Sequence, residues 1–402
     1  MNLISYVKEK GVVHSIKILW EYKIDIVLQK IFLIIYKKKA LKNWIILESH
    51  NDFDSNSGAF YDYLIQNGYN QKYKIIWLLR HKQNRNLPYN VQGVLLLRPS
   101  LKKAYFMVNA KYIITCHEVK GSIREGQKSY YLSHGPICLK SYKGKIIFPN
   151  SLQYYLCPSK YFAPIIADQL LSKYPDSRQI ILGYPSHDCF YERSKGDLEK
   201  ITQLSYRKVI LWMPTFRTNY TGTRCDSSKE MPMGIPIFNT MEEFEELNKK
   251  LKKVNSLLIL KIHPMQDMKK IKIKTLSNIV VLDGKTVKEL EVDNYKLMKD
   301  TDALISDYSS VAYDYLHMNK PIAYTLDDAE DYNLGFIVNE PKELMAGTFI
   351  YNQKDFNGFI DDVIQDKDEY KEAREKLLKK LFKYRDGNSS QRLAKHMGLS
   401  KD

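Results

Sequence analysis

One stretch of the chain indicates the kind of fold by itself: Ala303-Leu304-Ile305-Ser306-Asp307-Tyr308-Ser309-Ser310-Val311-Ala312-Tyr313-Asp314. A short apolar run leads into a loop rich in hydroxyl groups, and a segment of helical character follows. A buried strand joined to a helix by a short polar loop is the repeating unit of a parallel α/β sheet. Ligands of such sheets bind beyond the carboxyl ends of the strands, so the loop is also a candidate binding site.

The same pattern occurs in two sets along the chain. In the first set we expect strands at residues 44–47, 73–79, 94–97, 112–115, 130–133 and 154–157, with helices at 58–67 and 101–109. In the second set we expect strands at residues 209–213, 257–262, 279–282, 303–306 and 321–324, with helices at 241–254 and 311–317. The runs are rich in Ile, Val, Leu and Tyr and lack polar alternation, which is typical of strands covered on both faces.

The predicted fold class is therefore α/β, with two doubly wound, Rossmann-like parallel-sheet domains that face each other across a cleft. The polar, strand-poor segment 183–207 marks the junction between them. We expect domains at residues 44–195 and 196–402, and the second ends in a charged helical tail at 356–385. A basic helical segment at residues 1–43 precedes both domains.

Length and composition exclude several classes of protein. The chain has 402 residues, of which 44% are apolar, so two domains can each bury a core and a disordered chain is excluded. None of the 18 glycines lies closer than five positions to another, so the Gly-x-Gly of a dinucleotide-binding loop is absent. The one pair at P-loop spacing, Gly121 and Gly126, is followed by Gln127 and not by lysine. Nicotinamide enzymes, flavin enzymes and P-loop NTPases are therefore disfavoured.

Net charge and cysteine usage point to an anionic partner and a reducing compartment. Lysine and arginine number 62 against 46 acidic residues, which gives a net charge of +16. This balance favours nucleic acid, an acidic membrane surface or a polyanionic substrate, although compositional drift toward lysine is an alternative explanation. The five cysteines form no C-x-x-C pair, and free thiols in the cytoplasm fit them best.

The N-terminal segment is amphipathic over residues 12–36. Its apolar side chains recur at helical spacing, namely Ile16, Leu19, Trp20, Ile24, Val27, Leu28, Ile31 and Ile35. Lys23 and Lys30 stand at the edges of this stripe, and Lys37, Lys38 and Lys39 follow it. A helix of this kind can lie in an anionic leaflet, and the alternative is a helix packed on the domain behind it. No apolar run is long enough for a membrane span, and the segment does not have the form of a secretory signal.

In the first predicted domain a histidine follows a strand directly. Ser133, His134, Gly135 and Pro136 come at the end of the strand predicted for residues 130–133. The turn should hold His134 toward the cleft, where an imidazole is the natural proton acceptor near neutral pH. The alternative is a histidine that hydrogen-bonds to its own loop.

Two strand ends of the second predicted domain carry basic side chains. Arg217 follows the first strand of that domain, and its planar guanidinium suits phosphate, although it could be an ordinary surface arginine. At the next strand end, alternation puts Lys261 and His263 on the same side of the strand, and Pro264 ends the strand.

The loop after residues 303–306 is the richest of the strand ends. Ser309 or Ser310 could cap the following helix, and the free amides and positive dipole end of that helix suit a phosphate. Asp314 follows one turn later. A simple helix cap is the alternative, because paired serines before a helix are common.

At these residues the chain resembles the CDP-glycerol glycerophosphotransferase family, whose members build teichoic acids and related phosphate-containing surface polymers. The matching stretches are Glu48-Ser49-His50-Asn51-Asp52-Phe53, Pro214-Thr215-Phe216-Arg217, Lys261-Ile262-His263-Pro264, Ser306-Asp307-Tyr308-Ser309-Ser310 with Asp314, and Asp386-Gly387-Asn388-Ser389-Ser390-Gln391-Arg392. They span residues 44–395, and the Asp-Tyr-Ser-Ser stretch followed by aspartate is the most specific of them.

The resemblance implies a GT-B-like fold, with the acceptor bound by the first domain and a CDP-activated polyol donor bound by the second. It implies that His134 is the general base, that His263 is a second catalytic residue, and that Gly135 and Lys140 lie on the acceptor side. The residues implied around the donor pyrophosphate and nucleotide are Thr215, Arg217, Lys261, His263, Asp307, Ser309, Ser310 and Asp314.

The predicted reaction transfers glycerophosphate or a related polyol phosphate from CDP-glycerol to a glycan or teichoic-acid-like hydroxyl, with release of CMP. Family members usually act at the cytoplasmic membrane face on lipid-linked acceptors, which agrees with the basic amphipathic start. No residue spacing indicates a metal site or an obligatory cofactor, although a divalent cation could assist.

Two alternatives stay open at the level of sequence. A GT-B glycosyltransferase of capsule or lipopolysaccharide synthesis would grip the pyrophosphate of a nucleotide sugar in the same way. A nucleic-acid-binding protein is argued from charge alone, and it is disfavoured because zinc-finger spacing and an arginine-rich arm are lacking.

Overall fold

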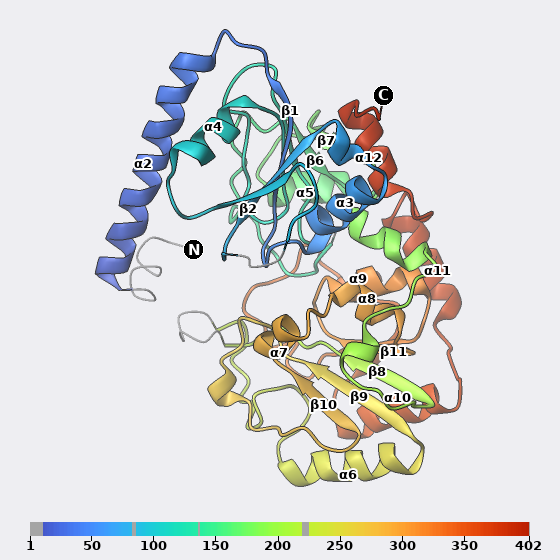
Figure 1. Ribbon diagram of the computed structural model, residues 1–402. Coiled ribbons are helices and arrows are strands. Elements are labelled where there is room, and N and C mark those ends of the chain that lie inside the picture. The colour runs from blue at the N-terminus through green and yellow to red at the C-terminus, as the bar shows by residue number, and fades with distance from the viewer. Residues whose placement is uncertain (1–10, 83–85, 136, 219–224, 402) are drawn as a thin grey trace. The chain divides into compact units, whose positions relative to one another are not determined.

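The computed structural model describes residues 11–82, 86–135, 137–218 and 225–401, and it contains two parallel sheets (Figure 1). The chain divides into two compact units. The first unit comprises residues up to 136, residues 143–191 and residues 382–402. The second comprises residues 137–142 and 192–381. Residues 1–10 of the basic segment predicted for residues 1–43, and Pro136 of the predicted histidine turn, lie outside the described residues.

The first unit is built on a seven-stranded parallel sheet with the strand order β3-β2-β1-β4-β5-β6-β7. Its strands are β1 (Lys42–Glu48), β2 (Lys74–Leu79), β3 (Val91–Leu95), β4 (Ala110–Thr115), β5 (Lys128–Tyr131), β6 (Tyr154–Leu156) and β7 (Gln179–Ile180). Its helices are α2 (Val12–Tyr36), α3 (Ser55–Gln66), α4 (Leu101–Asn109), α5 (Ala163–Gln169) and α12 (Ser389–Met397). The strand order reverses between β1 and β4, which is where doubly wound sheets bind ligands.

Helices cover both faces of this sheet because its strands are apolar on both sides. On one face, Phe106 of α4 belongs to the same buried cluster as Ile46 of β1 and Ile76 of β2. On the other face, the ring of Tyr61 in α3 lies 5.5 Å from the ring of Trp77. Successive residues of a strand point to opposite faces, so the neighbours Ile76 and Trp77 meet different helices.

The C-terminal helix α12 packs on the first unit. The carboxylate of Asp188, in the 3-10 helix η2 (Pro185–Tyr191), accepts the backbone N–H groups of Ser389 and Ser390 at 2.8 Å each. The hydroxyl of Tyr112 in β4 donates to the backbone carbonyl of Met397. The sequence predicts residues 382–402 as part of the second domain, but these buried contacts attach them to the first.

The second unit is built on a six-stranded parallel sheet with the strand order β10-β9-β8-β11-β12-β13. Its strands are β8 (Lys208–Trp212), β9 (Ser256–Lys261), β10 (Ile279–Leu282), β11 (Ala303–Ser306), β12 (Ile322–Thr325) and β13 (Thr348–Ile350). Its helices are α6 (Met241–Lys253), α7 (Gly284–Glu289), α8 (Asn294–Lys299), α9 (Val311–Tyr315), α10 (Gln353–Ile364) and α11 (Lys371–Leu381). Here the strand order reverses between β8 and β11.

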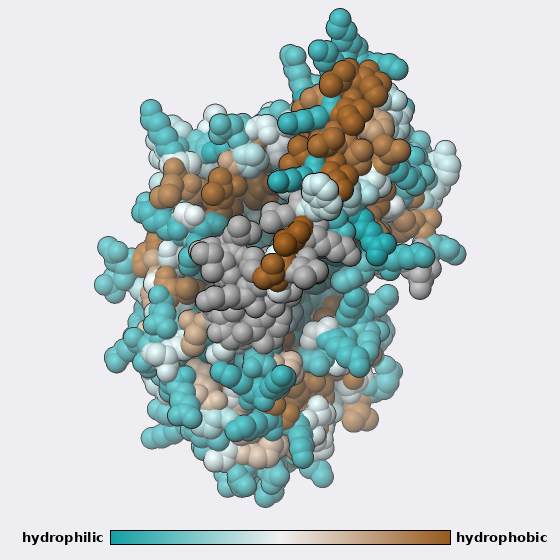
Figure 2. All heavy atoms as spheres, turned by 90° about the vertical axis from the view of Figure 1, so that its left-hand side faces the viewer, coloured by the Kyte–Doolittle hydropathy of each residue, from teal (hydrophilic) through white to brown (hydrophobic). Residues whose placement is uncertain are grey.

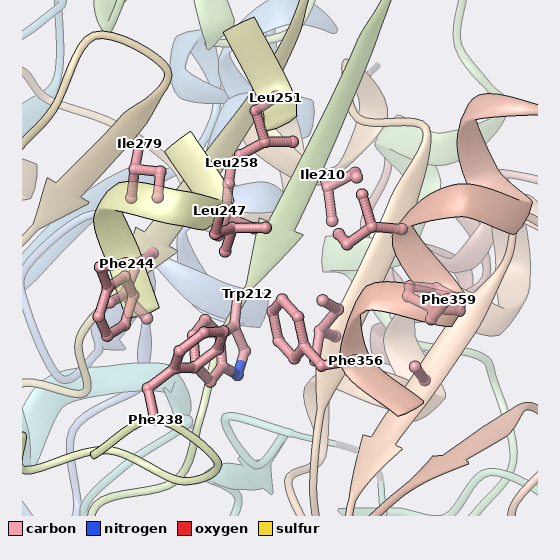
Figure 3. Close-up of a cluster of buried hydrophobic side chains, with 14 of the residues drawn as sticks. Ile210, Trp212, Phe238, Phe244, Leu247, Leu251, Leu258, Ile279, Phe356 and Phe359 are labelled. Carbon is pink, nitrogen blue, oxygen red and sulfur yellow. The ribbon is translucent and has the colours of Figure 1, made fainter. Parts of the chain in front are cut away.

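An aromatic core holds α6 and α10 against one face of this sheet (Figure 3). The indole ring of Trp212 in β8 lies 4.9 Å from the ring of Phe356 in α10 and 5.8 Å from that of Phe238. Phe238 in turn lies 4.4 Å from Phe244 of α6. Because Trp212 is the last residue of β8, this packing fixes the strand end from which the next loop starts.

The predicted strands and helices occur with small shifts at their ends. The helical tail predicted for residues 356–385 is broken into α10 and α11, because Asp366 takes a left-handed φ of 58° between them. The helix predicted for residues 311–317 ends as a 3-10 turn, η5 (Leu316–Met318). The strands β7 and β13 have only two and three residues, too few to form a recognisable apolar run.

The placement of α12 predicts which unit a cavity there would destabilise. Leu393 of α12 is fully buried, so Leu393→Ala should lower the free energy of unfolding of the first unit by about 2–5 kcal/mol. Hydrogen exchange should accelerate at β4 and β5 and not at β8 and β11. Lys395→Ala, on the exposed side of the same helix, is the matched control. Faster exchange in β8 and β11 alone would contradict the assignment of this helix.

Candidate functional site at the carboxyl ends of the strands

In the second unit, the strand order reverses between β8 and β11. Hydrogen bonds join the residues that follow these two strands. Thr215, just beyond β8, donates its backbone N–H to one carboxylate oxygen of Asp307 at 2.8 Å. Its hydroxyl donates to the other oxygen at 2.6 Å. Asp307 follows β11 directly and is fully buried. The two loops predicted to bind phosphate are therefore hydrogen-bonded to each other where they leave their strands.

Arg217 lies in the same buried network. Its Nη1 donates to Asp307 at 2.8 Å and to the backbone carbonyl of Thr215 at 2.8 Å. Its Nε and Nη2 donate to the carboxylate of Asp328 at 2.6 and 3.1 Å. The side chain is only 6% exposed, so its donors are engaged within the protein. The guanidinium of Arg217 ties three loops together, and its contact with phosphate stays a prediction.

Electrostatics keep this network charged. Burial opposes ionisation of Asp307, but the charges of Arg217 and Lys140 outweigh it and hold the pKa of Asp307 below its ordinary value. The same ion pairs raise the pKa of Arg217 in spite of its burial. A buried ion pair of this kind adds little net stability, because desolvation cancels most of the attraction. The ion pair instead fixes the positions of the loops that carry these side chains.

Lys140, for which the sequence motifs imply a place on the acceptor side, lies in the second unit. Residues 137–142 leave the first unit directly after the His134 turn and belong to the second. Lys140 forms an isolated antiparallel bridge with Phe336, and its ammonium group donates to the hydroxyl of Thr215 at 3.2 Å. Burial lowers the pKa of Lys140, and the nearby Asp307 acts against this shift.

The β9 end carries the predicted pair Lys261 and His263. The imidazole Nδ1 of His263 accepts the backbone N–H of Met265 at 3.0 Å, so the neutral ring carries its proton on Nε2 and can donate it. Its ring lies 4.9 Å from that of Phe216, next to the Arg217 network. Lys261 is buried, and burial lowers its pKa to about 8, partly offset by the charge of Asp293.

Ser309 and Ser310 are the first partly exposed residues after the buried β11. The predicted side-chain cap is wrong: Ser310 stands at the N-cap position of α9, but its backbone is helical and its side chain makes no cap hydrogen bond. The reason is that the loop enters the helix with helical dihedral angles. Asp314 lies on α9 and is buried.

In the first unit, a turn with unusual backbone geometry carries His134. Ser133 takes a left-handed φ of 60°, and its hydroxyl donates to the carbonyl of Gly135 at 2.8 Å. The buried Asn56 of α3 donates to the carbonyl of Ser133 at 2.8 Å and accepts from the hydroxyl of Ser186 at 2.8 Å. The His134 side chain is exposed, so the turn is fixed while the imidazole is accessible.

Several polar residues at these strand ends escaped the sequence analysis. Asp328 lies three residues beyond β12 and completes the Arg217 network. Arg80 and His117 follow β2 and β4 in the first unit. Their position directly after buried strands was the available signal. Within the described ranges of the chain, no group of three or more His, Cys, Asp or Glu could hold a metal ion.

Both sheets have the strand order of Rossmann-like, doubly wound domains, so the predicted α/β class with two such units is confirmed. The model of the family described as CDP-Glycerol:Poly(glycerophosphate) glycerophosphotransferase matches residues 30–398. The chain belongs to this family.

Two curated relatives illustrate the range of similarity. The teichoic acid ribitol-phosphate polymerase TarL of Staphylococcus aureus is 30% identical over 226 residues, which cover 54% of this chain and 36% of TarL. The chain thus matches little more than a third of the length of such relatives. The teichoic acid glycerol-phosphate transferase of the same organism is 26% identical over 394 residues, covering 88% of this chain and 92% of that protein.

Among solved structures, the wall teichoic acid polymerase TagF is similar over 99% of this chain and 98% of the TagF chain, with a TM-score of 0.73 and 18% sequence identity. At this identity the likeness concerns the fold alone. It confirms the GT-B-like fold class that the sequence motifs imply.

The buried network predicts a large stability loss at Arg217. Arg217→Met should lower the free energy of unfolding by about 3–5 kcal/mol, because it leaves the carboxylates of Asp307 and Asp328 buried without their partner. Chemical denaturation measures the change, and the exposed Arg193→Met should alter it by less than about 0.5 kcal/mol. An Arg217 variant of unchanged stability would show that the guanidinium is not a structural tie.

Proposed function

We propose that this protein transfers glycerophosphate, or a related polyol phosphate, from a CDP-activated donor to a hydroxyl of a teichoic-acid-like acceptor and releases CMP. The observation that carries the proposal is the family match over residues 30–398. Relatives matched over most of their own length carry names of the same chemistry. They include a teichoic acid poly(glycerol phosphate) polymerase from Bacillus spizizenii, of which the chain covers 82%.

In the proposed mechanism His134 is the general base. The acceptor oxygen attacks the distal phosphorus of the donor, the bond from that phosphorus to the bridging oxygen breaks, and the bridging oxygen leaves on CMP. His134 takes the proton of the attacking hydroxyl, which is worth about 10²–10⁴-fold in rate. The turn held by Asn56 leaves the imidazole accessible for this role.

The second unit binds the donor in this proposal. The Nε2–H of His263, and the partly exposed loop with Ser309 and Ser310, donate to the pyrophosphate oxygens and stabilise the leaving CMP. Buried Thr215, Arg217 and Asp307 act as positioning residues, since their polar groups are engaged with one another. Phosphoryl transfer depends mostly on positioning and charge stabilisation, which suits this division.

Lys261 and Asp314 have supporting roles in this scheme. Both are buried, and Lys261 contributes positive charge beneath the His263 loop. On the acceptor side, Gly135 belongs to the turn of His134. Only Gly135 and Pro136 stand between His134 and the segment that carries Lys140, so the base and the donor-side network are neighbours in the sequence.

A donor panel with two variants tests the proposal. The wild-type protein should transfer label from CDP-glycerol or CDP-ribitol, and not from nucleotide sugars, to a membrane fraction, with CMP as the second product. His134→Ala should lower kcat about 10²–10⁴-fold and leave the calorimetric Kd of the donor within about twofold. The double variant Ser309→Ala, Ser310→Ala should instead raise that Kd, by about tenfold for each hydrogen bond to a charged group and so by about a hundredfold for two.

The exposed His81 supplies the control, since His81→Ala should change neither quantity. Consumption of a sugar nucleotide alone would favour the glycosyltransferase alternative. Equal loss of donor affinity in the His134 and serine variants would contradict the division between base and donor loop.

We also propose that α2 attaches the protein to an anionic membrane surface, where a lipid-linked acceptor would be found. The exposed face of α2 carries a row of large apolar side chains (Figure 2), namely Val12, Ile16, Trp20, Ile24, Val27, Ile31, Ile34 and Ile35. Trp20 is 67% exposed and Ile34 73%. Lys23, Lys30 and the run Lys37–Lys39 are exposed beside them.

A different face of α2 packs on the rest of the first unit, so this packing is compatible with the proposed membrane contact. Asp25 pairs with Lys103 of α4 at 3.1 Å, and Phe32 lies 5.9 Å from Tyr105. The helix is thus anchored while its apolar row stays uncovered by the described residues. Among the described residues there is no helix of sufficient length and apolar character to span a bilayer. An interfacial position suits such a helix, with its lysines near acidic headgroups.

Vesicle flotation tests the role of α2. The triple variant Ile24→Glu, Val27→Glu, Ile31→Glu should float at least tenfold less with vesicles of phosphatidylcholine and phosphatidylglycerol, because it removes apolar area and adds negative charge. Leu171→Glu, at an exposed leucine elsewhere in the first unit, is the matched control. Flotation that is unchanged in the triple variant would mean that α2 does not contact the membrane.

A further inference from the structure

Four adjacent strands of the first sheet end in side chains that can donate to an anion. In the order of the sheet, Arg80 follows β2, His50 follows β1, His117 follows β4 and His134 follows β5. The His50 and His117 rings lie 4.3 Å apart, and those of His117 and His134 lie 5.8 Å apart. Three strand spacings amount to about 14 Å, so the row extends well beyond the one histidine proposed as the base.

Arg80 determines which form of His117 is present. Its Nη2 lies 2.9 Å from Nδ1 of His117, and a guanidinium can only donate, so Nδ1 must accept. The neutral ring therefore carries its proton on Nε2. Burial lowers the pKa of His117 to about 3, and the charges of His50 and Arg80 act in the same direction. The lowered pKa favours the neutral ring, in which His117 presents an Nε2–H donor.

The backbone beneath this donor is fixed by a buried carboxylate. Oε2 of Glu48 accepts the N–H groups of His117 and Glu118 at 3.1 Å each. Glu118 pairs with Lys120 at 2.9 Å and with Arg80 at 3.4 Å. The formal charges of these groups balance, so selectivity for an anion must come from directed N–H groups and not from excess charge.

Several polar atoms in this row lack a partner. Buried Nε of Arg80 and buried Nδ1 of His50 make no hydrogen bond to any residue in the described parts of the chain. Unsatisfied polar groups of this kind are costly, and a bound group rich in acceptor oxygens would relieve that cost for Nε–H of Arg80 and for His50 in the tautomer that carries its proton on Nδ1. A phosphate supplies such oxygens.

We propose that Arg80, His50 and His117 bind a phosphodiester group of the acceptor, next to the hydroxyl that His134 deprotonates. This deepens the proposed function and rests on it. The consequence is that the first unit selects an acceptor that already carries a polyol phosphate, so that the enzyme extends a chain of such units. An acceptor without phosphate would leave the row of donors unsatisfied.

A direct binding measurement with two soluble probes tests the proposed phosphodiester site and needs no turnover. Glycerophosphoglycerol has two glycerol groups joined by a phosphodiester, and diglycerol joins them by an uncharged ether. The full-length wild-type protein should bind the phosphodiester at least tenfold more tightly by calorimetry. Arg80→Gln and His117→Phe should each lose most of that preference and keep their Kd for CDP-glycerol within about twofold.

Matched variants separate a ligand contact from a folding defect. His117→Gln keeps both an acceptor for Arg80 and an outward N–H donor, so it should retain more of the preference than His117→Phe. Arg98→Gln removes the same charge from an exposed position of the same unit. It should change neither the preference for the phosphodiester probe nor the Kd for CDP-glycerol.

Two outcomes overturn the inference: equal affinity of the wild-type protein for both probes, or an undiminished preference in the Arg80 and His117 variants. The first comparison needs no variant, so it holds even where a substitution disturbs folding. If no CDP-activated donor is used in the donor panel, the proposed reaction is refuted and the result of this binding test is unaffected. If glycerophosphate is transferred from CDP-glycerol but the protein shows no preference for the phosphodiester probe, only the present inference is refuted.

Discussion

The buried ion pair between Arg217 and Asp307 joins the two strand ends at which the second sheet reverses its order. Thr215 and Asp328 complete the pair from β8 and from the loop after β12. Each group satisfies the charge or hydrogen-bonding need of another, and removing one leaves the others buried without a partner. The loops that carry Ser309 and His263 adjoin this buried network, so their positions depend on it.

A short segment that directly follows residues of the first unit in the chain also joins this network. Residues 137–142 follow the turn of the exposed His134, and they join the second unit through Lys140 and its bond to Thr215. In the first unit, Asn56 and Ser133 hold the turn of His134. Hydrogen bonds thus hold both the turn that carries His134 and the side chain of Lys140.

Most of the fold could be predicted because each strand is a short apolar run with its own local signal. The strands at residues 279–282 and 303–306 and the helix at 101–109 occur with the predicted bounds. The side-chain cap of α9 was wrong, and the buried partners of Arg217 could not be foreseen, because both depend on what the side chain meets. Ninety residues separate Arg217 from Asp307, and no local pattern reveals such a partner. The same holds for Arg80 and His117, which are separated by 37 residues.

The sequence by itself determined the α/β class, the strand ends that carry polar groups, the family and the amphipathic character of α2. These follow from periodicity and motif spacing, which act over a few residues. Only the tertiary structure decided that α12 belongs to the first unit, that residues 137–142 belong to the second, and that three imidazoles and an arginine form one row. The physical reason is that parallel strands bring together residues far apart in the chain. The hydrogen-bond partners at the strand ends therefore depend on the folded sheet and not on the local sequence.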